Sequence, residues 1–486
     1  MAKDYFQALP NELFGEVLTH LDLPSIQRLR LTSTSYASKC LCPAFIQYYS
    51  HQVTDLTPSS IGRLFQVTTH PILGPAIKDL TVDTVFYDPS EVIRSPALPG
   101  NQAPDTKVAQ EHARLLLANT QRLAWLMSKR HEQRGQFIDD VVVSLAHILE
   151  DMGSLSSLRL RCRIVREPCW SDKSVARAAH TNWNALWADC HRLLRIVTLA
   201  MTRSKVSVDT LSIFDESFGK VQAIAFTELS TDLTRLDFLT AAGAKIKNLN
   251  LSFSTATPVP LSDIIFNHDG SMDHRRARCL SPEIMVTGTP DFFLGIAAFL
   301  KLTPELECLD LYLYNTLSGH PAVYDRLFVH ISKDVHLPKL RRLTLRGIRA
   351  PHDALLFFLR KHPDITELDL REVHISGGTW DTIFKAFQHM PKLSKLHLEN
   401  LWSGSQHLLN LEPADPSFDD GKRGPGHSYG TKNGVMVHTR DITTEELRQE
   451  GGLKFRTVPG RSRGMGSRAL VQWMLERVVN YGPPQR

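Results

Sequence analysis

The sequence contains little that would mark a secreted or membrane-bound protein. Its 486 residues include only seven cysteines, an odd number scattered along the chain. Their spacing does not resemble the disulfide framework of a secreted protein, so a reducing compartment is expected. No window approaches the roughly 20 consecutive apolar residues of a membrane span, and the first residues lack the apolar run of a signal peptide. We expect a soluble intracellular protein, in the cytoplasm or the nucleus, with no membrane partner.

An excess of charge of one sign is also lacking. The 56 basic and 51 acidic residues leave a formal net charge of only +5, whereas nucleic-acid binders concentrate basic residues on one face. We therefore expect no nucleic-acid partner. Hydrophobic residues make up 42% of the chain and charged residues 22%, as in ordinary globular proteins. The length allows two to four domains or one long repeat array.

Recognisable catalytic motifs are missing as well. The glycine-rich stretch Gly424–Gly434 lacks the Gly-Lys-Ser/Thr ending of a phosphate-binding loop, and no Gly-x-Ser-x-Gly or His-Glu-x-x-His arrangement occurs. Cys162, Cys169, Cys190 and His191 could be drawn as a zinc site. They lack Cys-x-x-Cys spacing, so we interpret the cysteines as small core residues. We expect no enzymatic activity, no metal and no cofactor.

What the sequence does contain, between residues 9 and 45, is a compact helical pattern. Pro10 suits the start of a helix, and the apolar residues behind it recur at the spacing of one helix face. A second start lies at Pro24, and Tyr36 to Leu41 form a third short stripe. Three helices this short bury little surface. The module must therefore dock either on the rest of the chain or on a partner.

This stretch resembles an F-box. The matching positions are Leu9, Pro10, Glu12, Leu13, Val17, Leu18, Leu21, Ile26, Leu29 and Leu31. F-box proteins often carry Cys, a basic residue and Trp near the third helix, where this chain has Ser33, Thr34 and Tyr36. The resemblance implies that residues 5–48 bind a Skp-type adaptor, which links them to a cullin complex. It assigns the adaptor contact to Leu9, Pro10, Leu13, Val17, Leu18, Leu21, Ile26 and Leu29, some of which must also hold the three helices together.

A repeated unit follows in the second half of the chain. Pro304, Pro338, Pro363 and Pro391 each precede, by two residues, an aliphatic-x-x-Leu-x-Leu unit, and they are 34, 25 and 28 residues apart. This period is typical of leucine-rich repeats. Each proline ends a helix-like apolar stretch and favours extended backbone before it. Looser copies begin at Ile77, Leu155, Val208 and Ile246.

Strand-like units alternate with helical stripes such as Phe137–Met152, which Gly153 closes as a C-terminal cap. The alternation favours an α/β solenoid with strands on one side and helices on the other, although a doubly wound α/β domain is an alternative. The resemblance to fungal-type F-box proteins implies the same, because these often continue into irregular leucine-rich repeats. We assign residues 55–411 to an irregular leucine-rich-repeat-like solenoid. The asparagine of regular repeats is replaced by Tyr314, Ile348, Val373 and Leu401, so we expect irregular turns.

The strand residues that flank each central leucine should face outward and form a charged surface of alternating sign. The candidates for substrate binding are Asp310, Tyr312, Arg342, Arg346, Glu367, Asp369, Arg371, Lys395 and His397. Charge complementarity on such a surface can give a protein partner specificity and a fast association rate. The alternative is a solvated sheet face whose cross-strand ion pairs each contribute little.

Two segments rich in glycine and proline separate or follow the repeats. Residues 89–104 should form an exposed loop, and residues 412–466 a flexible Gly/Pro-rich loop region. Residues 467–481 should form a C-terminal helix that caps the open end of the solenoid.

The function predicted from these features is that of a non-catalytic adaptor. The F-box would join an SCF-type ubiquitin ligase through the Skp-type adaptor, and the repeats would bind an unknown protein substrate. The alternative is a non-degradative leucine-rich-repeat scaffold for protein interactions, with the same repeat surface and no cullin complex.

Overall fold

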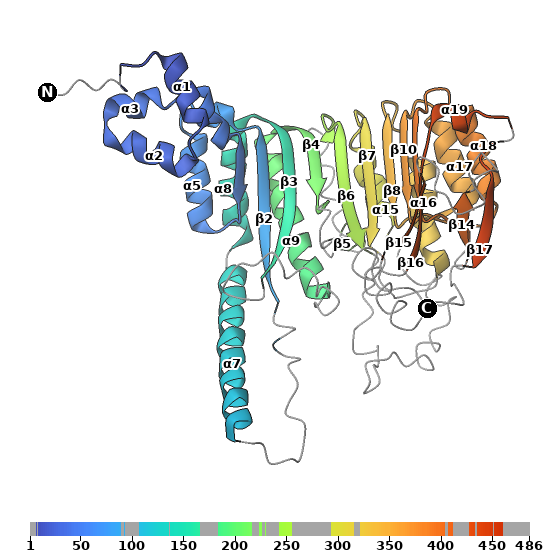
Figure 1. Ribbon diagram of the computed structural model, residues 1–486, viewed down its shortest axis with the longest axis horizontal. Helices are drawn as coiled ribbons and strands as arrows, with labels where there is room; N and C mark the ends of the chain where they lie inside the picture. Colours follow the sequence, from blue (N-terminus) through green and yellow to red (C-terminus); the bar gives the residue numbers. More distant parts are fainter. Residues whose placement is uncertain are drawn as a thin grey trace.

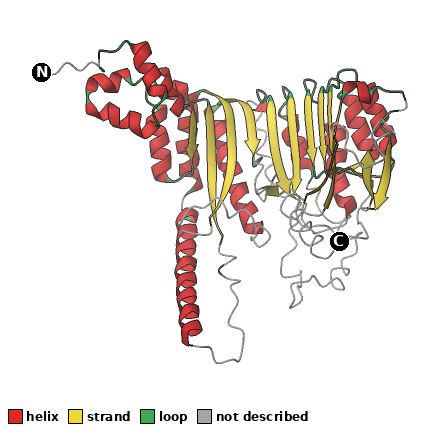
Figure 2. Cartoon of the chain, viewed as in Figure 1, coloured by secondary structure: helices red, strands yellow, loops and turns green. Residues whose placement is uncertain are grey.

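The computed structural model describes residues 6, 8–88, 92, 106–135, 137–165, 183–215, 223–225, 229, 243–254, 293–314, 321–403, 407–411, 427–432, 435–450 and 452–459. They form a mixed α/β molecule in which one large sheet runs most of the length of the protein (Figure 1). Figure 2 shows the strands side by side and the helices gathered along them. Within these ranges, no helix combines the length and apolar character needed to cross a membrane.

Four short helices begin the chain: α1 (Asn11–Thr19), α2 (Leu23–Thr32), α3 (Thr34–Lys39) and α4 (Pro43–Ile46), followed by the 3-10 turn η1 (Gln47–Tyr49). Asp22 caps α2 by accepting the Ser25 N–H at 2.9 Å, and Ser33 caps α3 in the same way. A separate small core holds these helices together: Phe14, Leu18, Ile26, Tyr36, Cys40, Phe45 and Leu73. Because Leu73 comes from the following segment, the helical module also packs on the rest of the chain.

The large sheet contains, in spatial order, β1 (His51–Thr54), β2 (Asp79–Tyr87), β3 (Ser154–Val165), β4 (Ser207–Ile213), β6 (Asn248–Ser254), β7 (Cys308–Tyr314), β8 (Arg342–Arg346), β10 (Glu367–Arg371), β12 (Lys395–Glu399), β16 (Val435–Ile442) and β15 (His427–Lys432), with β5 (Ile224–Ala225) beside β6. Neighbours from β1 to β12 are parallel, whereas β16 is antiparallel to both β12 and β15. All eight units expected to be strands lie here in chain order. The order does not reverse between β1 and β12, as it would in a doubly wound sheet.

The helices between the strands form a layer. They are α5 (Pro58–Thr68), α8 (Ile138–Met152), α9 (Trp183–Ser204), α15 (Leu294–Lys301), α16 (Pro321–Asp334), α17 (His352–Lys361) and α18 (Trp380–His389), with the 3-10 turn η2 (Gly74–Ala76) after α5. Contacts join α5 to α8 and α8 to α9. Further contacts join α15 to α16, α16 to α17, and α17 to α18. The leucines of the strands are buried in the core that these helices complete. Gly153 closes α8 with φ +67°, so the predicted cap is confirmed.

The same pair of backbone hydrogen bonds recurs at the start of most strands. The Glu307 carbonyl accepts the N–H groups of both Arg341 and Arg342, and the Arg341 carbonyl accepts those of Thr366 and Glu367. The same paired bonds run from Ser50 to residues 78 and 79, from Lys78 to 156 and 157, from Lys247 to 307 and 308, and from Thr366 to 394 and 395. Each turn therefore sets the register of the next strand.

The turns after the last three repeat strands are regular, contrary to the expectation from the missing asparagine. Gly347, Glu372 and Asn400 occupy the same position with φ of 68°, 50° and 49°. The next residue in each turn, Ile348, Val373 or Leu401, is buried. A buried aliphatic side chain thus replaces the expected asparagine. Each turn leads into a second sheet of order β17 (Phe455–Pro459), β14 (His407–Leu411), β13 (Trp402–Ser403), β11 (His374–Ser376) and β9 (Arg349–Pro351).

The C-terminal region departs from the prediction of a flexible loop over residues 412–466. Its described parts form β15, β16, the short helix α19 (Thr444–Leu447) and β17. The backbone of β16 pairs with the free edge of β12, from Leu396 opposite Ile442 to Glu399 opposite Thr439. An unpaired strand edge provides donors and acceptors for such a segment whatever its composition. The predicted loop at 89–104, apart from residue 92, and the predicted helix at 467–481 lie outside the described residues.

One long helix departs from the layer. α7 (Thr106–Arg134) contacts β2 near its C-terminal end, where Trp125 meets Tyr87 edge to face at 5.8 Å and Leu126 is buried. Its N-terminal part extends away from the rest of the molecule (Figure 1). Leu115, Leu116 and Leu117 on this part are exposed.

Candidate interaction surfaces

The eight residues assigned to adaptor contact by the resemblance separate into three groups. Leu18 and Ile26 are fully buried beside Phe14 and therefore hold the helices together. Leu13 is 56% exposed, and Pro10 is exposed as well. The other four are half-buried: Leu9, Val17, Leu21 and Leu29. A partner can reach Leu13 and Pro10 without any change in the module's core.

Two side-chain hydrogen bonds connect different parts of the helical module behind this surface. The Lys39 ammonium donates to the Leu9 carbonyl at 2.7 Å, and the Tyr48 hydroxyl donates to the Leu21 carbonyl at 2.9 Å. Leu31, near the end of α2, is 87% exposed. It belongs to the F-box-like pattern but is not among the eight residues that the resemblance assigns to the adaptor contact.

Eight of the nine residues predicted for substrate binding come together on the outward face of β7, β8, β10 and β12. The ninth, Tyr312, shares their strand register but is only 4% exposed and belongs to the large core, so a partner cannot reach its ring. The strand register places Asp310, Thr344, Asp369 and His397 opposite one another, and Asp441 of β16 continues this row. Tyr312, Arg346, Arg371 and Glu399 form the next row, and Cys308, Arg342, Glu367 and Lys395 the row before it. The alternation predicted from the sequence therefore produces three continuous rows.

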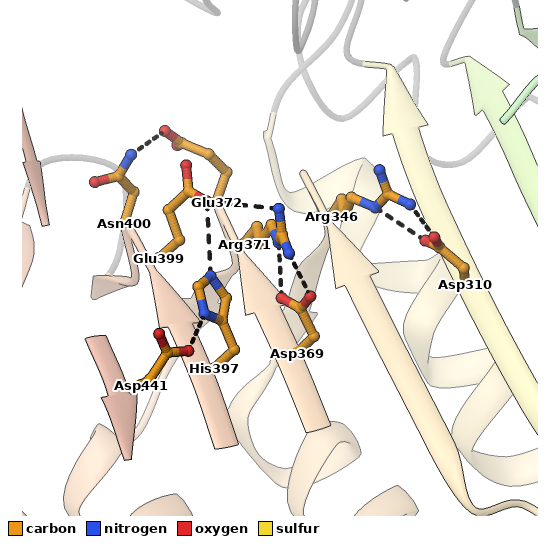
Figure 3. A network of polar contacts seen from close by, with 9 residues as sticks. All are labelled: Asp310, Arg346, Asp369, Arg371, Glu372, His397, Glu399, Asn400 and Asp441. Atoms are coloured by element: carbon orange, nitrogen blue, oxygen red, sulfur yellow. Dashed lines mark hydrogen bonds and ion pairs between the residues drawn. The ribbon is translucent and has the colours of Figure 1, made fainter. Parts of the chain in front are cut away.

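Charged side chains on these rows pair across and along the strands (Figure 3). Arg346 pairs with Asp310 from the neighbouring strand. Arg371 donates to Asp369 on its own strand at 2.6 and 2.8 Å. It also lies 3.9 Å from Glu399 on β12. Much of this face is therefore an internal network, as the solvated-face alternative proposed.

His397 lies where this network meets β16. Its Nδ1 is 2.6 Å from an oxygen of Asp441, and its Nε2 is 3.9 Å from Glu399 (Figure 3). Glu399 and then Asp441 raise the pKa of His397 above its usual value, against the opposing effect of burial. Protonation of His397 would strengthen the contact between β12 and β16.

A groove of about 830 Å³ follows the row that contains Asp310 and the row that contains Cys308. Its floor comes from β6, β7, β8, β10 and β12, and its wall from the end of β16 and the start of α19. Six of the nine predicted residues line it: Asp310, Arg342, Glu367, Asp369, Lys395 and His397. Tyr312, Arg346 and Arg371 do not line it, because they lie one row further along the strands.

The sequence reasoning missed the wall of the groove. Asp441, Thr443, Thr444 and Glu445 line it, but they fall within the region predicted to be a flexible loop. Thr443 caps α19 by accepting the Glu446 N–H. The motif Thr443-Thr-Glu-Glu446 has the form of a helix-capping box and could have predicted this helix.

Among the described residues, no group of histidine, cysteine and carboxylate side chains is arranged to hold a metal ion. Cys162 on β3 and Cys190 on α9 are buried within the large core. Burial, followed by the neighbouring Cys190, raises the pKa of the Cys162 thiol. A thiol with a raised pKa is a poor nucleophile.

No family model matches the chain, and a search of curated proteins found no match.

Proposed function

We propose that the protein is a substrate-recognition adaptor of a cullin–RING ubiquitin ligase. The helical module at residues 5–48 would bind a Skp-type adaptor as an F-box, and the outward sheet face would bind the protein substrate. The observation that supports this proposal is that some apolar residues of the module are buried whereas another is exposed. Leu18 and Ile26 form its core, whereas Leu13 remains 56% exposed on α1. Leu13 is thus an apolar residue available to a partner.

We also propose that the sheet and its helix layer form a leucine-rich-repeat solenoid. The unbroken chain order from β1 to β12 supports this, as do the paired backbone bonds at successive strand starts. In a solenoid each repeat contacts only its neighbours. The two ends can then carry different partners without sharing contacts.

The proposed role requires no catalytic residue in this chain. Holding a substrate beside the ligase's conjugating enzyme raises its effective concentration, and bond formation occurs on that enzyme. The chain would contribute two binding surfaces and the rigid distance between them.

Leu13→Asp tests the adaptor contact. The purified chain should capture a Skp-type adaptor in a pull-down, and the variant should lose this binding because a carboxylate would enter an apolar contact. Phe65→Asp is a matched control, since Phe65 is 47% exposed on α5, outside the module. Its binding should equal that of the wild type, and circular dichroism should show that both variants are folded.

Undiminished adaptor binding by folded Leu13→Asp would contradict the proposed contact. A wild-type chain that captures no adaptor would contradict the ligase role and favour a scaffold.

A further inference from the structure

The long helix α7 packs on the sheet with one face and exposes an apolar stripe on another. Trp125 meets Tyr87 of β2, and Leu126 is buried. Successive side chains advance about 100° around a helix, so a second stripe lies roughly 100–160° around α7 from these two residues. We call this stripe the α7 seam. Its described members, three or four residues apart, are Ala113, Leu116, Thr120, Leu123 and Met127.

Most of the seam is open to solvent. Leu116 and Met127 are 50% and 51% exposed. Ala113 and Thr120 are exposed as well, and Leu123 is half-buried. The Thr120 hydroxyl donates to the Leu116 carbonyl at 2.8 Å, so its hydrogen is satisfied within the helix and its methyl group is left to pack against a partner. The five seam side chains therefore offer an apolar contact with no unsatisfied donor.

The charged side chains along this part of α7 lie away from the seam. Between residues 113 and 127 they are Arg114 and Arg122, and both lie about 140° around the helix from the middle of the seam. Leu117, which is 61% exposed, and Ala124 flank the seam on one side, and Asn119 flanks it on the other. Two copies of the helix can therefore meet along their seams without bringing like charges together, which would be costly.

The order of large and small side chains along the seam suits an antiparallel pair of helices. If the two-fold axis is level with Ala118, then Leu116 is level with Thr120 of the second copy, and Ala113 is level with Leu123 of the second copy. The symmetry repeats both layers, so each of these layers joins a leucine to a small side chain, as close packing requires. In a parallel pair each residue would meet its own copy, and the alanine layer would be underpacked.

We propose that the α7 seam binds the α7 seam of a second copy of this chain in an antiparallel helix pair, which makes the protein a two-fold symmetric homodimer. A two-fold interface uses the same patch on both copies and must be complementary to itself, and the leucine-to-small layers meet this condition. The N-terminal part of α7, which extends away from the rest of the molecule (Figure 1), would gain the packing from which helices in proteins derive most of their stability.

Other occupants fit the seam less well. Helices that lie in a membrane interface bind through large residues such as tryptophan, whereas Trp125 packs on Tyr87 and the seam contains alanine and threonine. Neither the adaptor surface nor the sheet face includes the seam. The dimer therefore goes beyond the proposed ligase role and does not depend on it.

Sedimentation velocity with the full chain tests the dimer. The mass should rise with protein concentration from 54.8 kDa toward twice this value. Leu116→Glu should keep the chain monomeric, because a carboxylate would enter an apolar layer on each side of the axis, while glutamate preserves the helix. A wild-type chain that stays monomeric up to about 100 μM would overturn the second copy as the occupant.

Leu115→Glu is the matched control. Leu115 is 58% exposed on the same helix but lies about 120° around it from the middle of the seam, so this variant should dimerise as the wild type does. Circular dichroism should show equal helix content in both variants. Equal loss of the dimer in the two variants would contradict the assignment of the interface to the seam.

A mixture of two chains tests the antiparallel orientation. Ala113→Glu and Leu123→Lys should each weaken the dimer alone, and an equimolar mixture should restore it, because the two new charges are opposite in sign and share a layer. In a parallel pair the same charges would lie about 15 Å apart along the helix and restore nothing. A mixture that dimerises no better than its components would rule out the antiparallel pair, and the adaptor pull-down on the same variants would still report the ligase role separately.

Discussion

At the scale of single residues, His362 shows how a polar side chain is fixed inside an apolar layer. It is 3% exposed; its Nε2 accepts the Leu337 N–H at 3.1 Å, and its Nδ1 lies 2.8 Å from the Phe358 carbonyl. A neutral imidazole satisfies both bonds, because it donates from Nδ1 and accepts at Nε2. A second proton would point at the Leu337 N–H. Burial accordingly lowers the pKa of His362 to about 4.

This depressed pKa predicts an acid-dependent loss of stability. Between about pH 6.5 and pH 4 the unfolded chain binds a proton at His362 that the folded chain does not bind. The free energy of unfolding should therefore fall by up to about 3 kcal/mol over this range. Urea denaturation at several pH values measures the fall in the wild type.

The variant His362→Gln is the control for this titration, because glutamine does not titrate and still offers an acceptor. The difference in unfolding free energy between wild type and variant should change over the same range. Parallel pH profiles for the two proteins would rule out the assigned role of His362.

At the scale of elements, the end of α8 depends on a glycine. Gly153 has φ +67°, and an added Cβ would meet no atom within 4 Å, so any penalty at this site is conformational. Gly153→Ala should lower the free energy of unfolding by about 1 kcal/mol.

Gly62 lies inside α5 and also has open space for a Cβ. Gly62→Ala should raise the free energy of unfolding by roughly 0.5–1 kcal/mol.

Chemical denaturation of both alanine variants measures these opposite effects. The same sign for both substitutions would mean that the positive φ of Gly153 does not set the cost of replacing it.

The sequence predicts those helices and strands that are determined by residues within or directly beside the element. Prolines such as Pro363 end a helix, and the spaced leucines Leu368 and Leu370 define a strand with one buried face, so these patterns predict the strands and their alternation. They do not predict that Tyr312, at an outward position of β7, is covered by its neighbours and buried. The structure of β16 and α19 was missed because composition favoured a loop. The backbone of β16 pairs with the edge of β12 and with β15, and the residues of β16 themselves do not indicate that these partners are available. Likewise, the exposed fraction of Leu13 depends on how α1 packs, which periodicity does not specify.

At the scale of the whole molecule, two cores are joined by a small contact. Leu73 belongs to the core of the helical module, whereas the strands belong to the large core. The Ser50 carbonyl also accepts the N–H groups of Lys78 and Asp79. Removal of residues 1–46 should therefore leave a folded array, because it keeps Ser50 and β1.

Thermal unfolding followed by circular dichroism tests this truncation. A single cooperative transition is expected, at a somewhat lower temperature because Leu73 becomes exposed. Loss of a cooperative transition would show that the large core requires the helical module.

The unbroken order of parallel strands also sets the distance and the direction from the helical module to the groove. Each step along the sheet advances about 4.8 Å and turns by roughly 20–25°. Four steps separate β1, beside the helical module, from β6, where the groove begins. Adding or removing one repeat would therefore change both the distance and the azimuth between the two surfaces. An object held in the groove would then point in a different direction as seen from the module, even if every contact within the groove were preserved.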